Sequence, residues 1–308
     1  MSKRVLIAAP RSFCAGVVRS IEIVEKLLET HGPPVYVRHQ IVHNKHVVAD
    51  LESRGAVFVE SEEEVPEGAL VVLSAHGVAP EVYRKCEDRR LKVIDAVCPL
   101  VSKVHAEARR YAARGHRIAL IGHAGHVEVE GTMGEAPESM MLLETEEDAR
   151  SLELEPGTQL AYLTQTTLSV DDTSGVVMAL RDRFPDLIGP PSADICYATQ
   201  NRQDAVKKIC EQATLVLVVG SRTSSNANRL VEVARSRGAE AYLIDDETDL
   251  ESDWLDGHEV VGLTAGASSP DLLVTRVADR LAELGYSNRE EVELTREDVY
   301  FRLPAELR

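Results

Sequence analysis

Three cysteines stand at the same place in three similar stretches of this chain of 308 residues. Cys14, Cys98 and Cys196 each follow a run of β-forming residues and precede a pattern typical of a helix. Cysteine thiolates are soft ligands that suit zinc or an iron-sulfur cluster, and a cubane cluster held by only three cysteines leaves one metal open to a substrate. The pattern therefore predicts a metal centre with a vacant coordination position.

Polar loops recur at matching distances after the three cysteines. A second strand ends in a polar loop 29, 28 and 30 residues after the cysteine, a third strand runs into a cluster of acidic residues, and a fourth ends in a polar loop 62, 68 and 72 residues after it. The residues that mark these loops are His43, His126 and Asn226 after the second strand, and His76, Thr166 and Ser268 after the fourth. Because order, spacing and residue type repeat together, the chain is three copies of one α/β unit.

The repeat also predicts how the chain is organised. In open α/β units the ligand-binding loops lie at the carboxyl ends of the strands, and each of the three cysteines is expected at that edge. We therefore expect an α/β fold of three pseudo-equivalent lobes with mostly parallel sheets, packed around a pseudo-threefold axis on which the cysteines converge. The expected lobes are residues 1–96, 97–193 and 194–285, followed by a C-terminal tail, residues 286–308, that packs across another lobe.

The cysteines also have a simpler interpretation. A single cysteine at the end of a strand is usually a small buried hydrophobic residue. Recurrence in three equivalent places favours a ligand role instead, whereas Cys86 and Cys210 have no equivalents and are assigned a structural role. The cysteines number five and form no CxxC pair, which argues against a disulfide framework and against a zinc ribbon.

The composition narrows the class of partner. Lys and Arg number 34 against 51 Asp and Glu, and the resulting net charge of -17 disfavours binding to the phosphate backbone of a nucleic acid. No apolar run approaches the length of about 18 residues that a membrane helix needs, and the N-terminal VLIAA is too short for the apolar part of a signal peptide. We therefore expect a cytoplasmic protein that binds neither nucleic acid nor membrane and keeps its thiols reduced.

Hydroxyl, amide and imidazole side chains gather in the six expected loops. Where such side chains begin helices, backbone N–H groups and the positive end of the helix dipole favour an anion, so several helix starts facing one cavity would hold a diphosphate. The simpler interpretation is that each residue only caps its own helix; Ser225 or Asn226, for example, would cap the helix that ends near Gly238. Convergence of three lobes would favour the anion site.

Glu128 is the one carboxylate of these loops that lies near the end of a strand, two residues after His126. A carboxyl group in a partly enclosed site has a raised pKa and can donate a proton, and a neighbouring histidine can orient or recharge it. Glu128 is therefore the candidate proton donor, and His126 is the candidate catalytic residue that orients or recharges it. Glu130 would point the other way if the segment is extended, and no catalytic role is expected for it.

Eight motifs span nearly the whole chain. They are CAGV at Cys14, VHN at His43, SAHG at His76, DAVCPLV at Cys98, GHVEVEGTMG around His126, TQTTLS at Thr166, SSNANRL from Ser224 and TAGASSP at Ser268. Together they resemble the 4-hydroxy-3-methylbut-2-enyl diphosphate reductase family, which acts last in the methylerythritol phosphate route to isoprenoids. One departure is Val127, where many relatives have proline, and we expect it to change only the stiffness of the loop.

This resemblance implies a cofactor and a set of roles. It implies a trefoil of three α/β lobes around a central 4Fe-4S cluster, with Cys14, Cys98 and Cys196 as the cluster ligands. Glu128 would supply the proton, with Thr166 beside it at the hydroxyl end of the substrate. The residues implied to bind the diphosphate are His43, His76, His126, Ser224, Ser225, Asn226 and Ser268.

The implied reaction is the reductive dehydroxylation of 4-hydroxy-3-methylbut-2-enyl diphosphate to isopentenyl diphosphate and dimethylallyl diphosphate. Two electrons would pass through a 4Fe-4S cluster with an open iron. No GxGxxG motif opens a helix, so the electrons must come from another protein, and relatives use ferredoxin or flavodoxin. Two alternatives from other classes are a zinc-dependent hydrolase with a three-cysteine site and a non-catalytic iron-sulfur sensor.

Overall fold

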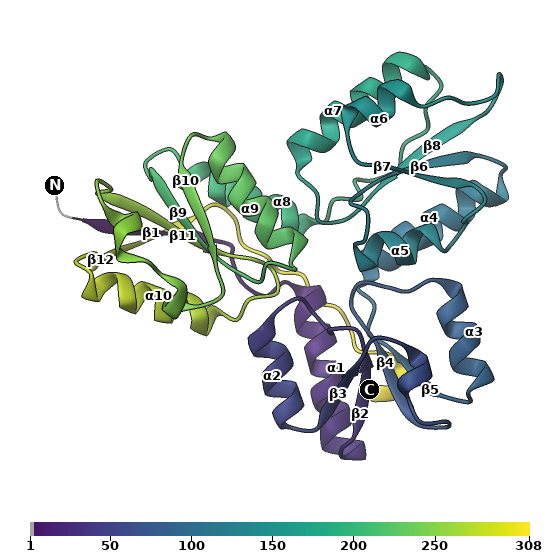
Figure 1. Ribbon diagram of the computed structural model, residues 1–308, viewed down its shortest axis with the longest axis horizontal. Coiled ribbons are helices and arrows are strands. Elements are labelled where there is room, and N and C mark those ends of the chain that lie inside the picture. Colours follow the sequence, from purple (N-terminus) through teal and green to yellow (C-terminus); the bar gives the residue numbers. More distant parts are fainter. Residues whose placement is uncertain (1–2) are drawn as a thin grey trace. The chain divides into compact units, whose positions relative to one another are not determined.

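The computed structural model describes residues 3–308, which form an α/β fold with three separate sheets (Figure 1). The strand orders are β3-β2-β4-β5 for the first repeat, β7-β6-β8 for the second, and β10-β9-β11-β1-β12 for the third. Every strand pair of the described chain is parallel. The prediction of three α/β lobes with mostly parallel sheets is confirmed.

The strands are short, and those of one sheet come from one repeat apart from β1 and β12, which come from the first repeat and the C-terminal tail. The first sheet contains β2 (Val35–Arg38), β3 (Ala56–Val59), β4 (Leu70–Leu73) and β5 (Lys92–Asp95). The second contains β6 (Arg117–Ile121), β7 (Met140–Leu143) and β8 (Leu160–Thr164). The third contains β1 (Arg4–Ala9), β9 (Leu215–Val219), β10 (Glu240–Ile244), β11 (Val260–Ala265) and β12 (Asn288–Glu293).

Helices connect the strands, as parallel pairing requires. In the first repeat they are α1 (Ala15–His31), α2 (Lys45–Ser53) and α3 (Pro80–Asp88). In the second they are α4 (Pro99–Ala113), α5 (Val127–Met133), α6 (Glu146–Ser151) and α7 (Val170–Arg183). In the third they are α8 (Tyr197–Ile209), α9 (Ser225–Ser236) and α10 (Asp271–Glu283).

The third sheet shows why its strands read as continuous apolar runs. Side chains alternate across a strand, so Leu215 and Leu217 pack on one face with α10, whereas Val216 and Val218 pack on the other with α8 and α9. All five residues of β9 are buried. Burial on both faces removes the polar alternation, and the carboxyl edge of the sheet is left as the place for polar loops.

The strand that leads into each cysteine belongs to the sheet of the preceding repeat. β5 runs to Cys98 and pairs with β4, and Ile188, on the way to Cys196, forms a bridge with Ala161 of β8. By the same rule β1 pairs with β11 of the third repeat, although the sequence placed it in the lobe of residues 1–96. Each cysteine therefore follows the carboxyl edge of the sheet that belongs to the preceding repeat, and Cys14 follows the sheet of the third repeat.

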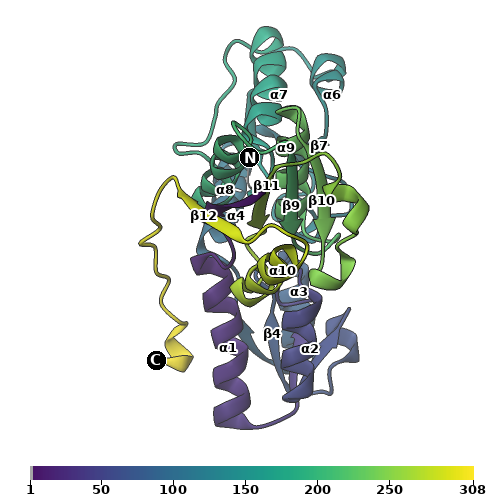
Figure 2. The same cartoon turned by 90° about the vertical axis from the view of Figure 1, so that its left-hand side faces the viewer.

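The C-terminal segment contains a strand that the apolar pattern did not predict. β12 pairs with β1 along its whole length (Figure 2). Its NREEVE side chains are nonetheless nearly all exposed. Charged residues on an edge strand discourage further pairing, which explains the missing alternation. Beyond it, the carbonyl of Arg302 accepts a hydrogen bond of 2.9 Å from Arg19 Nε of α1.

The described residues fall into two compact units. One contains the chain up to Val18, His43–Ala49 and Tyr197–Tyr300; the other contains Arg19–Val42, Asp50–Cys196 and Phe301–Arg308. Among residues 3–308 no helix combines the length and the apolar character that crossing a membrane requires.

Candidate functional site

The three cysteines share one local geometry. Each is the residue immediately before a long helix, and each side chain is partly buried. Their backbone N–H groups donate to equivalent carbonyls: Cys14 to Ala267 (3.3 Å), Cys98 to Ala75 (3.0 Å) and Cys196 to Thr166 (3.0 Å). Cysteine sulfur is a soft metal ligand that suits zinc or an iron-sulfur cluster. The repeat thus presents three matching soft ligands.

These hydrogen bonds correct the alignment of the fourth-strand loops. Ala75, Thr166 and Ala267 each lie two residues after the end of β4, β8 or β11. The counterpart of His76 and Ser268 is therefore Thr167, and the sequence alignment that placed Thr166 there is wrong by one position. The loop residues lie 62, 68 and 72 residues after their cysteines, and this variation is too large to align the loops residue by residue. Because Thr166 and Thr167 are the same residue type, the sequence also does not show which of them is the counterpart.

Glu128 is held in a buried position at the start of α5. Only 3% of it is exposed. Its Oε1 accepts a hydrogen bond from the Thr166 N–H at 2.6 Å, and its Oε2 accepts one from the Thr166 hydroxyl at 3.0 Å. Burial raises the pKa of Glu128 to about 7, although both Thr166 hydrogen bonds lower it.

His126 caps the helix that carries Glu128. Its Nδ1 accepts the Glu128 N–H at 3.2 Å, so the neutral ring carries its proton on Nε2. His76 lies beside it, with the ring centroids 6.1 Å apart and the planes at 82°. The segment is helical rather than extended, yet Glu130 is exposed, as expected. Val127 is the first residue of α5, a position where proline is also well tolerated. Valine in place of the proline of many relatives therefore leaves the start of the helix intact.

The raised pKa of Glu128 makes the stability of the protein depend on pH. The side chain stays protonated in the folded state up to about pH 7, against 4.5 for an ordinary glutamate, so its favourable contribution is lost as pH rises to about 7. Glu128→Gln keeps the neutral form and should raise the free energy of unfolding at pH 8 by roughly 1–3 kcal/mol, but hardly at pH 4.5. Urea unfolding at both pH values measures this, with the exposed Glu130→Gln as the control that should show no such difference.

Gly77 fixes the loop that carries His76. Its φ is +79°, and an added Cβ would lie 2.9 Å from His105 Cε1. Gly77→Ala should therefore cost roughly 2–4 kcal/mol, of which about 1 kcal/mol is backbone strain and the rest overpacking. Gly115→Ala is the matched control, because Gly115 has φ +78° and no atom near the added Cβ. Equal losses of thermal stability in the two variants would show that the contact with His105 is unimportant.

The remaining candidate residues brace one another. Ser224, rather than Ser225 or Asn226, caps α9, with its Oγ accepting the Ala227 N–H at 3.3 Å. Asn226 Oδ1 accepts from Ala267 N at 2.9 Å and its Nδ2 donates to Thr199 Oγ1 at 3.3 Å. These contacts are structural, but the Ser224 hydroxyl hydrogen and the second amide hydrogen of Asn226 are not used by them.

Asn226 and Glu128 are structural counterparts. Each is the second residue of its helix, and each accepts the backbone N–H two residues past the fourth strand. The same bracing position thus holds an amide in the third repeat and an acid in the second. Ser268, in turn, donates its hydroxyl to the carbonyl of His43 at 3.0 Å.

The two compact units divide the candidate residues. The unit with Arg19–Val42 and Asp50–Cys196 holds Cys98, Cys196, His76, His126, Glu128 and Thr166. The unit with the N-terminal strand holds Cys14, His43, Ser224, Ser225, Asn226 and Ser268. Within neither unit do three His, Cys, Asp or Glu side chains of the described residues form a metal site by themselves.

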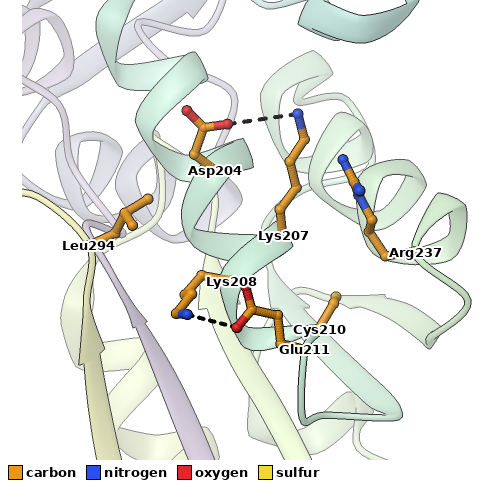
Figure 3. Close-up of a pocket in the computed structure, with 7 residues that line it drawn as sticks. All are labelled: Asp204, Lys207, Lys208, Cys210, Glu211, Arg237 and Leu294. Atoms are coloured by element: carbon orange, nitrogen blue, oxygen red, sulfur yellow. Dashed lines mark hydrogen bonds and ion pairs between the residues drawn. The ribbon is translucent and has the colours of Figure 1, made fainter.

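A separate cavity of about 500 Å³ lies at the far end of α8 (Figure 3). It is lined by Asp204, Lys207, Lys208, Cys210, Glu211, Arg237 and Leu294. Burial raises the pKa of the Cys210 thiol to about 11, and it raises the pKa of Cys86 as well, so both thiols stay protonated at neutral pH. Cys210 follows the last residue of the 13-residue α8, so it lies about 20 Å along the helix axis from the start of that helix, where Cys196 precedes it. This cavity is therefore not part of the candidate site.

Comparison with known proteins places the chain in a family. The family model described as LytB protein matches residues 5–282. A 4-hydroxy-3-methylbut-2-enyl diphosphate reductase of Acidothermus cellulolyticus is 60% identical over 307 residues, covering 99% of this chain and 90% of the relative. A counterpart in Streptomyces coelicolor is 55% identical, covering 99% of this chain and 91% of the relative.

A solved structure has the same fold. The E-1-hydroxy-2-methyl-but-2-enyl-4-diphosphate reductase of Plasmodium falciparum matches with a TM-score of 0.97 and 39% identity, covering 100% of this chain and 97% of its own. The family model and the curated relatives each extend over nearly all of the repeat described above. This chain therefore belongs to the LytB family of 4-hydroxy-3-methylbut-2-enyl diphosphate reductases.

Proposed function

We propose that this chain reduces 4-hydroxy-3-methylbut-2-enyl diphosphate to isopentenyl diphosphate and dimethylallyl diphosphate, the reaction of the family to which it belongs. The observation that carries the proposal is the buried Glu128 carboxyl, bound by Thr166 and held at a pKa of about 7. Such a group is an acid poised to work at neutral pH. The zinc hydrolase and the non-catalytic sensor have no support among the relatives, which are named as reductases.

A 4Fe-4S cluster held by Cys14, Cys98 and Cys196 fits the donor set. The three cysteines are all partly buried and make equivalent backbone hydrogen bonds, and the chemistry of three thiolates suits iron-sulfur clusters. In addition, the Ala15 N–H beside Cys14 donates to the hydroxyl of Tyr197, the residue after Cys196, at 3.3 Å. When bound, the cluster would supply electrons one at a time and an open iron that polarises the hydroxyl group of the substrate.

The protein's own residues would handle protons and charge. The substrate takes up two electrons and two protons, its allylic C–O bond breaks, and its hydroxyl leaves as water. Glu128 delivers the proton for that water, and the Thr166 hydroxyl, which donates to Glu128 Oε2, orients the carboxyl group. Burial raises the pKa of Glu128 to about 7, so a large share of the molecules would hold this proton at neutral pH.

The diphosphate would be bound by polar groups rather than by lysine or arginine. The proposed ligands are His43, His76, His126, Ser224, Ser225, Asn226 and Ser268. The capping contact of His126 uses Nδ1, so Nε2 is the ring atom that would donate to a phosphate oxygen in this proposal. The Ser268 hydroxyl would have to exchange the His43 carbonyl for a phosphate oxygen.

The proposal extends to shape, partner and location. Three lobes arranged as a trefoil would bring the three sulfur atoms to one cluster, as the repeat predicts. The electron donor would be ferredoxin or flavodoxin, and the reduced cysteines point to the cytoplasm. A basic surface must then compensate for the net charge of -17 when an acidic donor docks.

Anaerobic purification tests the proposal directly. The protein should be brown, contain iron and acid-labile sulfide, and convert the allylic diphosphate to both products when a chemical reductant is added. A colourless protein that contains zinc and releases no product under the same conditions would show that the proposal is wrong.

A further inference from the structure

Each of the three cysteine-bearing helices carries a cation one to two turns beyond its cysteine. The residues are Arg19 on α1, Lys103 on α4 and Arg202 on α8, which follow Cys14, Cys98 and Cys196 by five, five and six residues. Neither the acid nor the diphosphate site described above uses them. Arg19 is 9% exposed and Arg202 is fully buried, which is unusual for arginine.

Arg19 binds the backbone that leads into the next cysteine along the chain. Its Nη1 donates to the carbonyl of Val97, the residue directly before Cys98, at 2.9 Å. The neighbouring Ser20 hydroxyl donates to the carbonyl of Ala96 at 2.9 Å. Helix α1 therefore fixes two successive peptide groups before Cys98.

Lys103 and Arg202 repeat this arrangement. Lys103 Nζ lies 2.8 Å and 3.0 Å from the carbonyls of Ser192 and Ala193, and 3.0 Å from Asp194 Oδ1, two residues before Cys196. Arg202 Nη2 donates to the carbonyl of Ser12, two residues before Cys14, at 2.7 Å. In every case the cation follows one cysteine and holds the segment before the next, with the third repeat returning to the first.

These contacts explain how the segments before the cysteines, which lie outside the β-sheet hydrogen bonding, can still be held in place. A carbonyl that has no partner in a sheet must find another donor when it is buried, and a charged donor makes the stronger bond. Asp194 also accepts the Thr164 N–H at 3.0 Å, so Lys103 is tied to the end of β8, two residues before Thr166. The position of a cysteine is thus set by a side chain of the preceding repeat as well as by its own helix.

We infer that Arg19, Lys103 and Arg202 are positioning residues for the metal centre, each holding the cysteine of the following repeat in place for cluster binding. This inference rests on the proposed iron-sulfur function. It predicts that removing one cation loosens the backbone before the next cysteine along the chain, and not the cysteine that precedes the same helix. The affected cysteine is Cys98 when Arg19 is removed and Cys196 when Lys103 is removed.

The test uses cluster-loaded enzyme and two readouts besides turnover. Lys103→Met should lose its visible absorption to an iron chelator about 10- to 100-fold faster than the parent, the usual effect of removing a group that supports a metal ligand. Limited alkylation with iodoacetamide, followed by peptide mass spectrometry, should find Cys196 modified first. Lys103→Arg keeps donors at this place and should restore most of the cluster lifetime. Lys208→Met, on the exposed side of α8 with a surface ion pair to Glu211, should match the parent.

Arg19→Met is the second variant. Among residues 3–308 Arg19 donates to backbone carbonyls and pairs with no carboxylate, so its removal leaves no buried charge unpaired there. Lys103→Met, by contrast, removes the counter-charge of the buried Asp194. In Arg19→Met the first alkylated residue should be Cys98. Cluster lifetimes equal to that of the parent, or one order of alkylation shared by both variants, would overturn the inference. A parent enzyme without a cluster would instead refute the proposed function, and the spectrum of the parent shows this before any variant is compared.

Discussion

Glu128→Gln is expected to lower kcat by about 10²- to 10⁴-fold while the visible spectrum and substrate affinity stay close to those of the parent. The amide keeps the shape of the side chain and can still accept the Thr166 N–H, but it has no acidic proton to give to the leaving hydroxyl. Turnover with a chemical reductant and binding measured by calorimetry separate the two effects. Glu130→Gln is the matched control, because Glu130 lies two residues further along α5 and is exposed.

The same group gives a signature in the pH profile. The protonated form of Glu128 is the active one, so kcat/KM should be flat below pH of about 7 and fall about tenfold for each further pH unit. Glu130→Gln should keep this limb of the profile. An active Glu128→Gln variant with the parent's pH profile would show that the proton comes from another group.

Replacing Cys98 by serine is expected to remove cluster and activity together. A serine hydroxyl is a hard, neutral ligand in place of a thiolate, and three sulfur donors are the minimum for the proposed centre. Iron and sulfide per chain should fall to background, and turnover should be undetectable. Because the local geometry of the three cysteines is equivalent, Cys14→Ser and Cys196→Ser should behave in the same way.

Two further cysteines provide the controls for this result. Cys86 is fully buried and Cys210 partly buried, and burial raises the pKa of both thiols. Cys86→Ser and Cys210→Ser should retain iron, sulfide and turnover, with at most a loss of stability from placing a hydroxyl in an apolar site. Loss of iron in either control, or retention of the full spectrum in Cys98→Ser, would contradict the assignment of ligands.

The sequence predicted the parts of the fold that depend on repetition. Strands such as β9 are uniformly apolar and recur at fixed distances from a cysteine, so the three parallel sheets and the position of the cysteines followed from pattern alone. The exchange of β1 into the third sheet could not be predicted, because its apolar side chains would fit either sheet. β12 was missed because an exposed edge strand with charged side chains has no apolar period.

The sequence predicted which types of residue form the candidate site, but it did not predict the contacts among them. His126 and Glu128 drew attention as an imidazole and an acid near the end of a strand, yet the hydrogen bonds between Glu128 and Thr166 connect residues 38 positions apart. The one-residue slip at Thr166 arose because distance along the chain says little about register across a loop. The role of Lys103 was also invisible, since a lysine on a polar helix face is normally solvated, and only the structure brings its Nζ to Asp194.

An anomalous difference map at the iron absorption edge, from crystals grown without oxygen, tests the shared metal centre most directly. The account predicts one compact peak within bonding distance of the sulfur atoms of Cys14, Cys98 and Cys196. Iron at fewer than three of these sulfur atoms, or separate peaks at different cysteines, would contradict it.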